Sequence, residues 1–474
     1  MILLLVTNLS SKLPLKLSLI LLVITLFAGA SAAHAQGNDP QDPQYVVQPG
    51  DTLSSIALRF DVSQQEIIQA SNLANPDALN VGDVLTIPGI DWVEGVLTFT
   101  EMPLGESLLS LQRRYRLPAE SLTRLNRITS PDQLYAGLPV LVATQRGELV
   151  DTGRALVAPE VSLLEIAVAN GDNPWAISAL NQLPGTWAAV PGDVLFTPAR
   201  QAPGPGGLPS PITALEVDAP GFVQGHTVVL TLAAPDDLEL GGDLVGNPLH
   251  FFSESEGAWV TLQGIPLEAG SGIYSLTISG LLGGEAPFAF SQPIRVQSGG
   301  FERFNLFVDD PALLDPERSA AESEQVREIM SALSSEKLWE GRWGWPHNLV
   351  NEVTSGFGEF RTYNGGLAES YHYGVDFGGG ALLEIFAPAP GRVIFAGPLD
   401  IRGNATIIDH GWGIFTGYWH QQEIYVAEGD MVKPGEVIGI VGGTGRVKGP
   451  HLHWEVWANG VPIEPLDWLE RAFP

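Results

Sequence analysis

The segment GPHLHWEV, residues 449–456, carries two histidines in a run of alternating apolar and β-branched residues. This alternation predicts a strand, and positions i and i+2 of a strand point to the same face, so His451 and His453 are expected to project side by side. Upstream, HYGVD places His372 four residues before Asp376, and the glycine run that follows argues against a helix. In an extended segment this even spacing also aligns both side chains. Two histidines and a carboxylate that converge would provide the three protein ligands of a catalytic zinc site.

Histidine is concentrated in the final third of the chain. Of the nine histidines, six lie beyond residue 345, and such clustering favours a site over scattered core histidines. These six are His347, His372, His410, His420, His451 and His453.

The composition describes a folded, acidic protein. Its 474 residues are 45% hydrophobic, which suits several packed domains. Asp and Glu number 54 against 24 Lys and Arg, and the net charge of −30 argues against nucleic acid as a partner, because phosphate binding needs clustered basic residues. The sequence has no cysteine, which excludes disulfides and thiolate ligands. Any metal must therefore be held by nitrogen and oxygen.

Residues 1–35 have the pattern of a secretory signal peptide. Lys12 and Lys16 precede an apolar run at 17–30, and the small-residue pattern AHA at 33–35 is typical of a cleavage site. We therefore expect a secreted or cell-envelope protein that has no membrane segment after cleavage. An uncleaved signal anchor is the alternative, which an apolar run of 14 residues disfavours.

A β-α-α-β pattern follows at residues 45–89. Apolar residues at positions 53, 56, 57 and 60 fall on one helical face, and Ser63 with Glu66 forms a capping box for a second helix. A short strand is predicted on either side. The stretches YVVQPGDTLSSIA and NVGDVLTIP resemble the lysin motif. This resemblance implies binding to glycans that contain N-acetylglucosamine, such as peptidoglycan or chitin.

The same pattern recurs twice in weaker form, at residues 97–143 and 154–200. GESL at 105–108 repeats GDTL of the first copy, and PGDVL at 191–195 repeats its VGDVL turn and strand. We interpret both segments as divergent lysin motifs. Whether these two copies still bind glycan is left open.

Three segments connect the repeats to the C-terminal part. Residues 201–211, QAPGPGGLPSP, form a Pro- and Gly-rich linker. Residues 212–299 contain short alternating stretches that predict an immunoglobulin-like β-sandwich, interpreted as a spacer. Residues 312–338 predict a connecting helix, with Asp315 as its cap and Pro316 at its first position.

From about residue 343 to 474, glycines and β-branched residues predict a mainly antiparallel sheet. The motifs SGFGEFRTYN, HYGVD, IIDHGWG, GYWH and VKPGEVIGIVGGTGRVKGPHLHWEV occur there in order. Together they resemble the lysostaphin-type zinc endopeptidases over roughly residues 345–468. That family cuts peptide bonds in the stems and cross-bridges of peptidoglycan.

The resemblance implies roles for five side chains. His372, Asp376 and His453 match the family's zinc ligands, and His420 and His451 match its two non-ligand catalytic histidines. A neutral imidazole held near the zinc-bound water can take its proton, and the tetrahedral oxyanion and leaving amine need a partner. Which of His420 and His451 is the base stays open.

Other residues of this region receive plainer interpretations. His410 is interpreted as a structural turn histidine, and His347 lies outside every matched motif. Arg361 either lines the substrate groove or lies on the surface. One departure concerns GYWHQ, where the family has a small residue at the position of Trp419 and a leucine at that of Gln421. This departure is expected to narrow or repolarise the groove.

The sequence therefore predicts a multidomain zinc endopeptidase that is held on peptidoglycan by lysin motifs and hydrolyses peptide cross-links. A catalytically silent wall-binding protein that activates a peptidoglycan amidase is the main alternative. A zinc peptidase that acts on another secreted protein is a further one. An N-terminal segment that supplies a fourth zinc ligand also stays open. The sequence assigns neither the scissile bond nor an oligomeric state.

Overall fold

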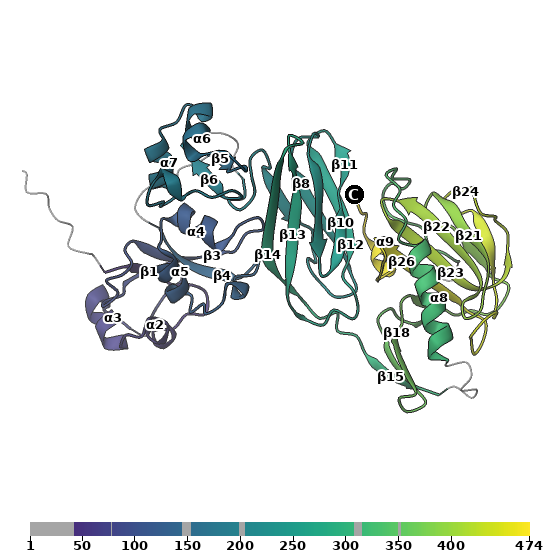
Figure 1. The fold of residues 1–474 in the computed structure, drawn as a ribbon. Helices are drawn as coiled ribbons and strands as arrows, with labels where there is room; N and C mark the ends of the chain where they lie inside the picture. Colours follow the sequence, from purple (N-terminus) through teal and green to yellow (C-terminus); the bar gives the residue numbers. More distant parts are fainter. Residues whose placement is uncertain (1–41, 77, 145–152, 199–203, 308–314, 349–351) are drawn as a thin grey trace, which may run out of the picture. The chain divides into compact units, whose positions relative to one another are not determined.

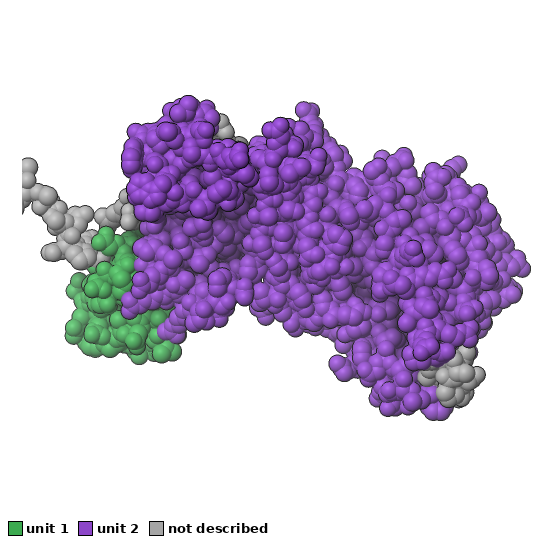
Figure 2. All heavy atoms as spheres, viewed as in Figure 1, with its two compact units in different colours: residues 1–97, 143–146 green, residues 98–142, 147–474 purple. Residues whose placement is uncertain are grey.

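The computed structural model describes residues 42–76, 78–144, 153–198, 204–307, 315–348 and 352–474 (Figure 1). The signal peptide predicted at residues 1–35 lies outside the described residues. The chain divides into two compact units, residues 1–97 with 143–146 and residues 98–142 with 147–474, which Figure 2 colours separately. In the described ranges, no helix combines the length and the apolar character that a membrane-spanning segment needs.

The first unit contains the β-α-α-β pattern predicted for residues 45–89. Strand β1 (Gln44–Val46) pairs antiparallel with β2 (Val84–Thr86). Helices α2 (Leu53–Phe60) and α3 (Gln64–Ser71) lie between these strands in sequence.

Local sequence signals explain both helices of this module. Leu53, Ile56 and Ala57 of α2 are buried, as the apolar periodicity predicts. The capping box of α3 is also confirmed, because Ser63 N donates to Glu66 Oε2 at 2.8 Å and Glu66 N donates to Ser63 Oγ at 3.2 Å. Each cap satisfies backbone groups that the first turn of a helix leaves without partners.

The two later repeats keep the same element order, each with a short 3₁₀ turn before its last strand. The second repeat comprises β3 (Val96–Glu101), α4 (Leu108–Tyr115), α5 (Ala119–Leu125), η2 (Pro131–Gln133) and β4 (Pro139–Thr144). The third comprises β5 (Gly153–Leu156), α6 (Leu163–Asn170), α7 (Pro174–Leu180), η3 (Thr186–Ala188) and β6 (Val194–Thr197).

One asparagine in each later repeat ties the second helix to the closing strand. Asn126 Nδ2 donates to the carbonyl of Leu141 at 2.8 Å and its Oδ1 accepts from Leu141 N at 2.6 Å. Asn181 makes the equivalent pair of hydrogen bonds to Phe196, at 2.6 and 2.8 Å. Because these bonds close the module through side-chain chemistry, weak sequence similarity is enough to keep the fold.

The middle region forms two four-stranded antiparallel sheets within the part of the chain that is described. We call residues 214–296 the two-sheet domain. Side chains from both sheets, such as Leu230, Ile278 and Phe290, are buried in one common core. One sheet contains β7 (Ala214–Val217), β8 (Thr227–Ala233), β12 (Ala258–Gly264) and β11 (Phe252–Ser255), and the other contains β10 (Asn247–His250), β9 (Glu239–Leu244), β13 (Gly272–Leu282) and β14 (Ala286–Val296).

The described part of the predicted linker, residues 204–211, is packed and not free. Leu208 is fully buried. Arg154, at the start of the third repeat, donates from Nη1 to the carbonyls of Pro205 and Leu208 at 2.7 and 2.9 Å. A buried guanidinium bonded to several carbonyls holds this segment against the third repeat.

The helix predicted at 312–338 is shorter in the structure. Helix α8 spans Pro316–Ile329, with Asp315 Oδ1 accepting from Glu317 N at 2.9 Å, so the predicted cap is confirmed. Residues 330–338 are turn and irregular backbone, and residues 312–314 lie outside the described residues. Ser331, Ser334 and Ser335 after Met330 favour the early end, because serine competes for backbone hydrogen bonds in a helix.

The C-terminal region is mainly antiparallel sheet, as predicted. Of the residues described, strands of one ten-stranded sheet follow the order β16-β19-β26-β23-β22-β21-β24, with β20, β25 and β27 joined at its sides. Its members are β16 (Val353–Ser355), β19 (Val375–Phe377), β20 (Glu384–Phe386), β21 (Gly391–Leu399), β22 (Gly403–Gly411), β23 (Ile414–Ile424), β24 (Met431–Val432), β25 (Val437–Val441), β26 (Leu452–Ala458) and β27 (Val461–Ile463). A short helix, α9 (Leu466–Glu470), follows β27.

A second, smaller sheet brings a connecting segment into the C-terminal region. Strand β15 (Arg303–Leu306) follows the two-sheet domain and pairs parallel with β17 (Phe360–Tyr363), which pairs antiparallel with β18 (Ala368–Tyr371). The β17–β18 hairpin leads directly into His372.

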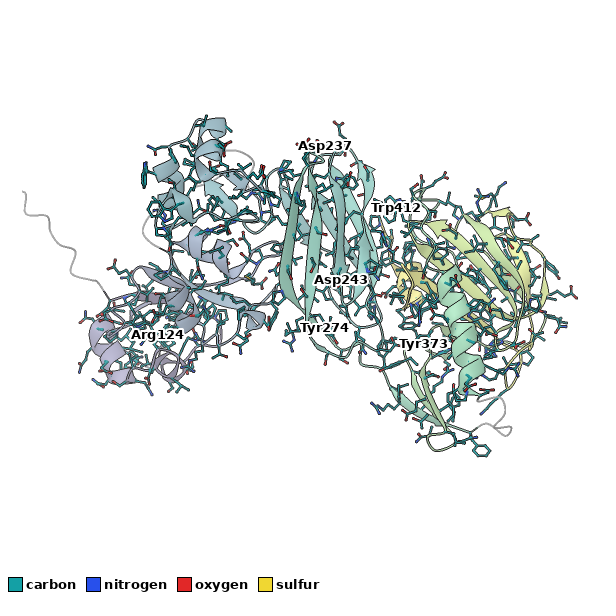
Figure 3. All side chains as sticks on the ribbon, viewed as in Figure 1. Arg124, Asp237, Asp243, Tyr274, Tyr373 and Trp412 are labelled. Atoms are coloured by element: carbon teal, nitrogen blue, oxygen red, sulfur yellow. The ribbon has the colours of Figure 1, made fainter. Side chains whose placement is uncertain are left out.

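The two-sheet domain packs on the C-terminal region through an apolar contact. Val260 and Leu262 of β12 belong to the same buried cluster as Trp454 and Val456 of β26. Trp412, labelled in Figure 3, stacks on Phe252 with ring centroids 5.2 Å apart. Tyr373, also labelled there, donates its hydroxyl proton to Glu268 of the two-sheet domain at 2.7 Å.

Candidate metal centre

Three side chains from two neighbouring strands and one loop converge at one point. Asp376 lies on β19 directly opposite His453 on β26, and His372 lies just before β19. His372 Nε2 is 3.0 Å from Asp376 Oδ1 and 2.9 Å from His453 Nδ1, which is 2.7 Å from the same carboxylate oxygen. The ligand atoms all lie within 4.8 Å of one another. The structure therefore brings together the set that the sequence resemblance implied.

The outer nitrogen of each imidazole is bonded to an oxygen acceptor. His372 Nδ1 donates to the carbonyl of Gly356 at 2.6 Å. His453 Nε2 donates to Glu455 Oε1 at 2.9 Å. A carbonyl or an ionised carboxylate accepts only, so each neutral ring carries its proton outside and presents an unprotonated nitrogen to the centre.

This arrangement fits a metal ion. In the neutral rings, both inner nitrogens and Asp376 Oδ1 present lone pairs at hydrogen-bonding distance, and these groups repel unless a cation lies among them. Burial opposes charge on His453, yet the hydrogen bonds that the ring donates to Asp376 and Glu455 raise its pKa to about 9, so a cation bound at the centre would take the place of the second ring proton. The pKa of Asp376 is well below its usual value, because His372 and His453 outweigh the effect of burial. Neutral imidazoles and an ionised carboxylate are the forms that bind metal.

The two further histidines lie beside this centre. His451 comes just before β26, with its Nε2 3.7 Å from Asp376 Oδ1 and its Nδ1 bonded to the carbonyl of Gly449 at 2.8 Å. The ring of His420 is 5.0 Å from that of His451 and 6.3 Å from that of His453, measured between centroids. Its Nδ1 donates to the carbonyl of Thr444 at 2.8 Å. With Nδ1 as the donor in each ring, Nε2 is the nitrogen that is left for proton transfer.

The backbone of His420 is held in an uncommon conformation. Its φ is +65°, in the left-handed region, and the pairing of β22 with β23 shifts register next to it. Such a bulge redirects a side chain out of the regular alternation of a strand. His420 N donates to the carbonyl of Arg402 at 2.8 Å, which helps to keep this conformation. Burial lowers the pKa of His420 to about 3, and the neighbouring His453 and His451 add to that effect, so the ring is neutral.

Three residues that support the ligands were missed or left undecided by the sequence. Glu455 continues the i, i+2 alternation of His451 and His453, a signal that was present in HLHWE. Arg361 is bonded inside the site, where its Nη2 lies 3.4 Å from Asp376 Oδ2. Gly374 has no room for a side chain, since an added Cβ would lie 2.7 Å from His453 Nε2 and 2.4 Å from the carbonyl oxygen of Trp454.

The other histidines of the region are structural. His410 is fully buried on β22, donating from Nδ1 to the carbonyl of Pro390 at 2.7 Å, with its Nε2 2.9 Å from Thr416 Oγ1. The sequence had suggested a turn at this position, but His410 lies in strand β22. His347 is 2% exposed and packs on Phe377, with ring centroids 4.4 Å apart.

The expectation that Trp419 and Gln421 alter the substrate groove is wrong. Trp419 is 1% exposed and packs with Met330, which follows α8. Gln421 is fully buried and donates to Thr406 Oγ1 at 2.8 Å. Because the bulge turns only His420 toward the centre, its neighbours face the interior.

Comparison with known families agrees with the two kinds of module. Residues 370–465 match Peptidase family M23, and residues 45–88 and 104–142 match the LysM domain. The chain thus carries an M23 peptidase domain of the lysostaphin type behind LysM domains. The third repeat, residues 154–200, is not among these matched ranges and its assignment stays a prediction.

Individual proteins match over the C-terminal region. DD-carboxypeptidase/endopeptidase Mpg of Neisseria meningitidis is 43% identical over 95 residues, 20% of this chain and 22% of that protein. Peptidoglycan DD-endopeptidase ShyB of Vibrio cholerae is 33% identical over 115 residues, 24% of this chain and 27% of that protein. The chain therefore spans about a quarter of the length of these relatives. The catalytic domain of lysostaphin from Staphylococcus simulans is 30% identical with a TM-score of 0.23, covering 26% of this chain and 98% of that one.

Proposed function

We propose that this chain, which carries an M23 peptidase domain behind LysM domains, is a secreted zinc-dependent endopeptidase that hydrolyses peptide cross-links of bacterial peptidoglycan. The observation that carries the proposal is the convergence of His372, Asp376 and His453 on one point beside two further histidines. Two imidazoles and one carboxylate are a donor set that zinc uses in hydrolytic enzymes, where an open position is left for water. The signal sequence predicted at residues 1–35 supports export to the cell envelope.

The chemistry divides between the ion and the protein. Zinc, when bound, supplies polarisation of the scissile carbonyl and acidifies a water molecule. His420 and His451 each present an unprotonated Nε2 near the centre, so one is positioned to take the proton of the attacking water. Once protonated at Nε2, that ring can pass the proton on to the leaving amine, and the other ring would bond the oxyanion only when its own Nε2 carries a proton. Arg361 and Glu455 hold Asp376 and His453 in place.

We further propose the cross-link of directly joined stems, D-alanyl to a diamino acid, as the bond. The support is the similarity to Mpg and ShyB, both named for a DD-endopeptidase activity. A glycine bridge is the other substrate that the family resemblance allows. Mass spectra of the products separate the two, because cleavage of a direct cross-link converts dimeric muropeptides to monomers without loss of glycine.

The remaining modules are assigned the role of placing the enzyme on its polymer. LysM domains on the same chain raise the effective concentration of stem peptides near the active site without any contact there. For residues 212–299 we propose an immunoglobulin-like spacer, supported by the two sheets that share one core. In the third repeat, Trp187 is 74% exposed, and an exposed indole ring is suited to stacking on a sugar. Sacculus binding by Trp187→Ala tests whether this repeat contributes.

The decisive experiment measures release of soluble muropeptides from purified sacculi by the protein from Gln36 onward. The expected result is release with zinc, and loss of release with a chelator and in His453→Ala. His250→Ala is the matched control, because His250 lies on β10 of the two-sheet domain, far from the ligand set in sequence. If zinc and sacculi are bound and no peptide is released, the proposed activity is wrong and the silent amidase activator becomes the better reading.

A further inference from the structure

Helix α8 precedes the matched peptidase residues, yet it covers the sheet face that carries the metal centre. His453, Glu455 and Trp457 alternate along β26 and therefore point to one face. Trp457 is buried in one cluster with Val326 of α8 and with Met330. In Figure 1, α8 lies across the strands β23 and β26.

The same helix contributes a buried carboxylate to that face. Glu322 is 6% exposed. Its Oε2 accepts from Ile401 N at 2.7 Å, and its Oε1 accepts from Arg402 N at 3.0 Å and from Arg402 Nη1 at 3.2 Å. These partners lie in the turn before β22, and the carboxylate fixes both the backbone and the side chain of Arg402.

Arg402 links this carboxylate to the centre in two ways. Its Nη2 lies 4.0 Å from Glu455 Oε1, the oxygen that accepts from His453 Nε2. Its carbonyl accepts from His420 N at 2.8 Å. The guanidinium also covers the ring of Trp419 at 5.3 Å, so Arg402 is held from both sides.

We propose that Glu322 is a positioning residue for the metal centre and acts through Arg402 on Glu455, His453 and His420. The proposal deepens the peptidase function proposed above and rests on it. In this arrangement the helix before the matched domain is part of the catalytic unit.

The physical reason is the balance of two carboxylates around one buried cation. With Glu322 ionised, Arg402 donates to Glu322 and stays 4.0 Å from Glu455, which leaves the Glu455–His453 bond intact. Without that charge, Arg402 is a buried cation with one remaining anion near it, and it is drawn toward Glu455. Arg402 and His453 then compete for Glu455, and this competition weakens the hydrogen bond that orients the His453 ring. In Glu322→Gln the turn at 401–402 also loses one of its two acceptor oxygens, which weakens the support of the left-handed conformation of His420.

The test compares Glu322→Gln with Glu324→Gln in the full chain from Gln36 onward. Glu324 lies on the same helix, but its side chain is 69% exposed and pairs with Arg327 of the same helix. Four measurements are made on each variant: the kinetics of muropeptide release, which give kcat and KM, zinc affinity by chelator competition, the visible spectrum of the cobalt-substituted protein, and the unfolding midpoint. Arg402→Gln and the double variant Glu322→Gln/Arg402→Gln complete a double-mutant cycle.

In Glu322→Gln, kcat and zinc affinity should each fall by roughly tenfold, the scale found for partners of metal ligands, while KM changes by less than about twofold. The cobalt spectrum should shift, because the ligand geometry changes. Glu324→Gln should match the unsubstituted protein in all four measurements. The double variant should lose no more kcat or zinc affinity than the worse single variant, because both substitutions interrupt the same chain of contacts from Glu322 through Arg402 to Glu455.

Two results would overturn the proposal. One is a Glu322→Gln protein with the kcat, zinc affinity and cobalt spectrum of Glu324→Gln. The other is a loss of activity that only follows the fraction of unfolded protein, with normal zinc affinity in the folded fraction. If the unsubstituted protein releases no muropeptides, the proposed function fails, and zinc affinity and the cobalt spectrum still decide the positioning role.

Discussion

Glu464 should make the contact between the two-sheet domain and the C-terminal region weaken as the pH rises. It follows β27, and its backbone N donates to the carbonyl of Gly225 at 2.8 Å. Burial raises its pKa from 4.5 to about 7, with Asp467 and Glu470 adding to the rise. In the folded protein Glu464 therefore prefers to be neutral.

The sign and size of this effect on the free energy of unfolding follow from the different pKa values of Glu464 in the folded and unfolded chains. Below pH 4.5 Glu464 is neutral in both the folded and the unfolded chain, so it carries no penalty. As the pH rises through about 7, the unfolded chain ionises more easily than the folded one, and folding loses on the order of 3 kcal/mol. His226 acts in the same direction: its hydrogen bond with Asp467 raises its pKa, so its contribution is present below pH 6.5 and is lost as the pH rises through the folded value.

The assay is the unfolding midpoint of Glu464→Gln and of the unsubstituted protein between pH 4.5 and 8.5. Glutamine keeps the acceptor for Leu466 N, which Glu464 Oε1 binds at 3.1 Å. The two proteins should agree at the acidic end, and at pH 8.5 the variant should unfold several degrees higher. Glu428→Gln, an exposed glutamate that does not contribute to the pKa shift of Glu464, is the control. A difference between the two proteins that does not vary with pH would refute the reasoning.

The other predictions concern the metal centre and α8. Glu455→Gln should lower zinc affinity by roughly 10–100-fold in chelator competition, and an unchanged affinity would show that its bond to His453 is unimportant. Gly374→Ala should lose zinc and activity but keep sacculus binding in a pelleting assay, because the added Cβ would meet His453 Nε2 at 2.7 Å. Met330→Ala should cost about 2–5 kcal/mol in denaturant unfolding, since Met330 is fully buried, whereas Leu333→Ala, at a side chain 51% exposed, should cost far less.

The sequence predicted those parts of the site that depend on local spacing. The spacing of His451 and His453, and that of His372 and Asp376, aligned the side chains within each pair, and the family resemblance implied that the two pairs meet. The capping box of Ser63 and Glu66 is local in the same sense. In each case the periodicity of the backbone decides which side chains meet.

Features that depend on distant parts of the chain could not be predicted in this way. Glu322 and Arg402 are 80 positions apart, and their bond exists only because α8 packs on the sheet. Trp419 was expected to shape the groove, but a bulge at His420 decides which neighbours face the interior. Alternation is a rule for regular strands, and it fails where one residue adopts a left-handed backbone.

The position of α8 also bears on how such proteins can be recombined. The family match begins at residue 370, so a chimera that joins a new binding module to the peptidase domain would be designed with its junction just before that residue. A junction at that point would remove the helix that packs on Trp419 and Trp457. The transferred domain would then expose an apolar surface that favours aggregation. A junction before β15, at residue 303, would keep α8 and the strand that pairs with β17. The segment that can be exchanged as a folded unit is thus longer than the range that matches the family.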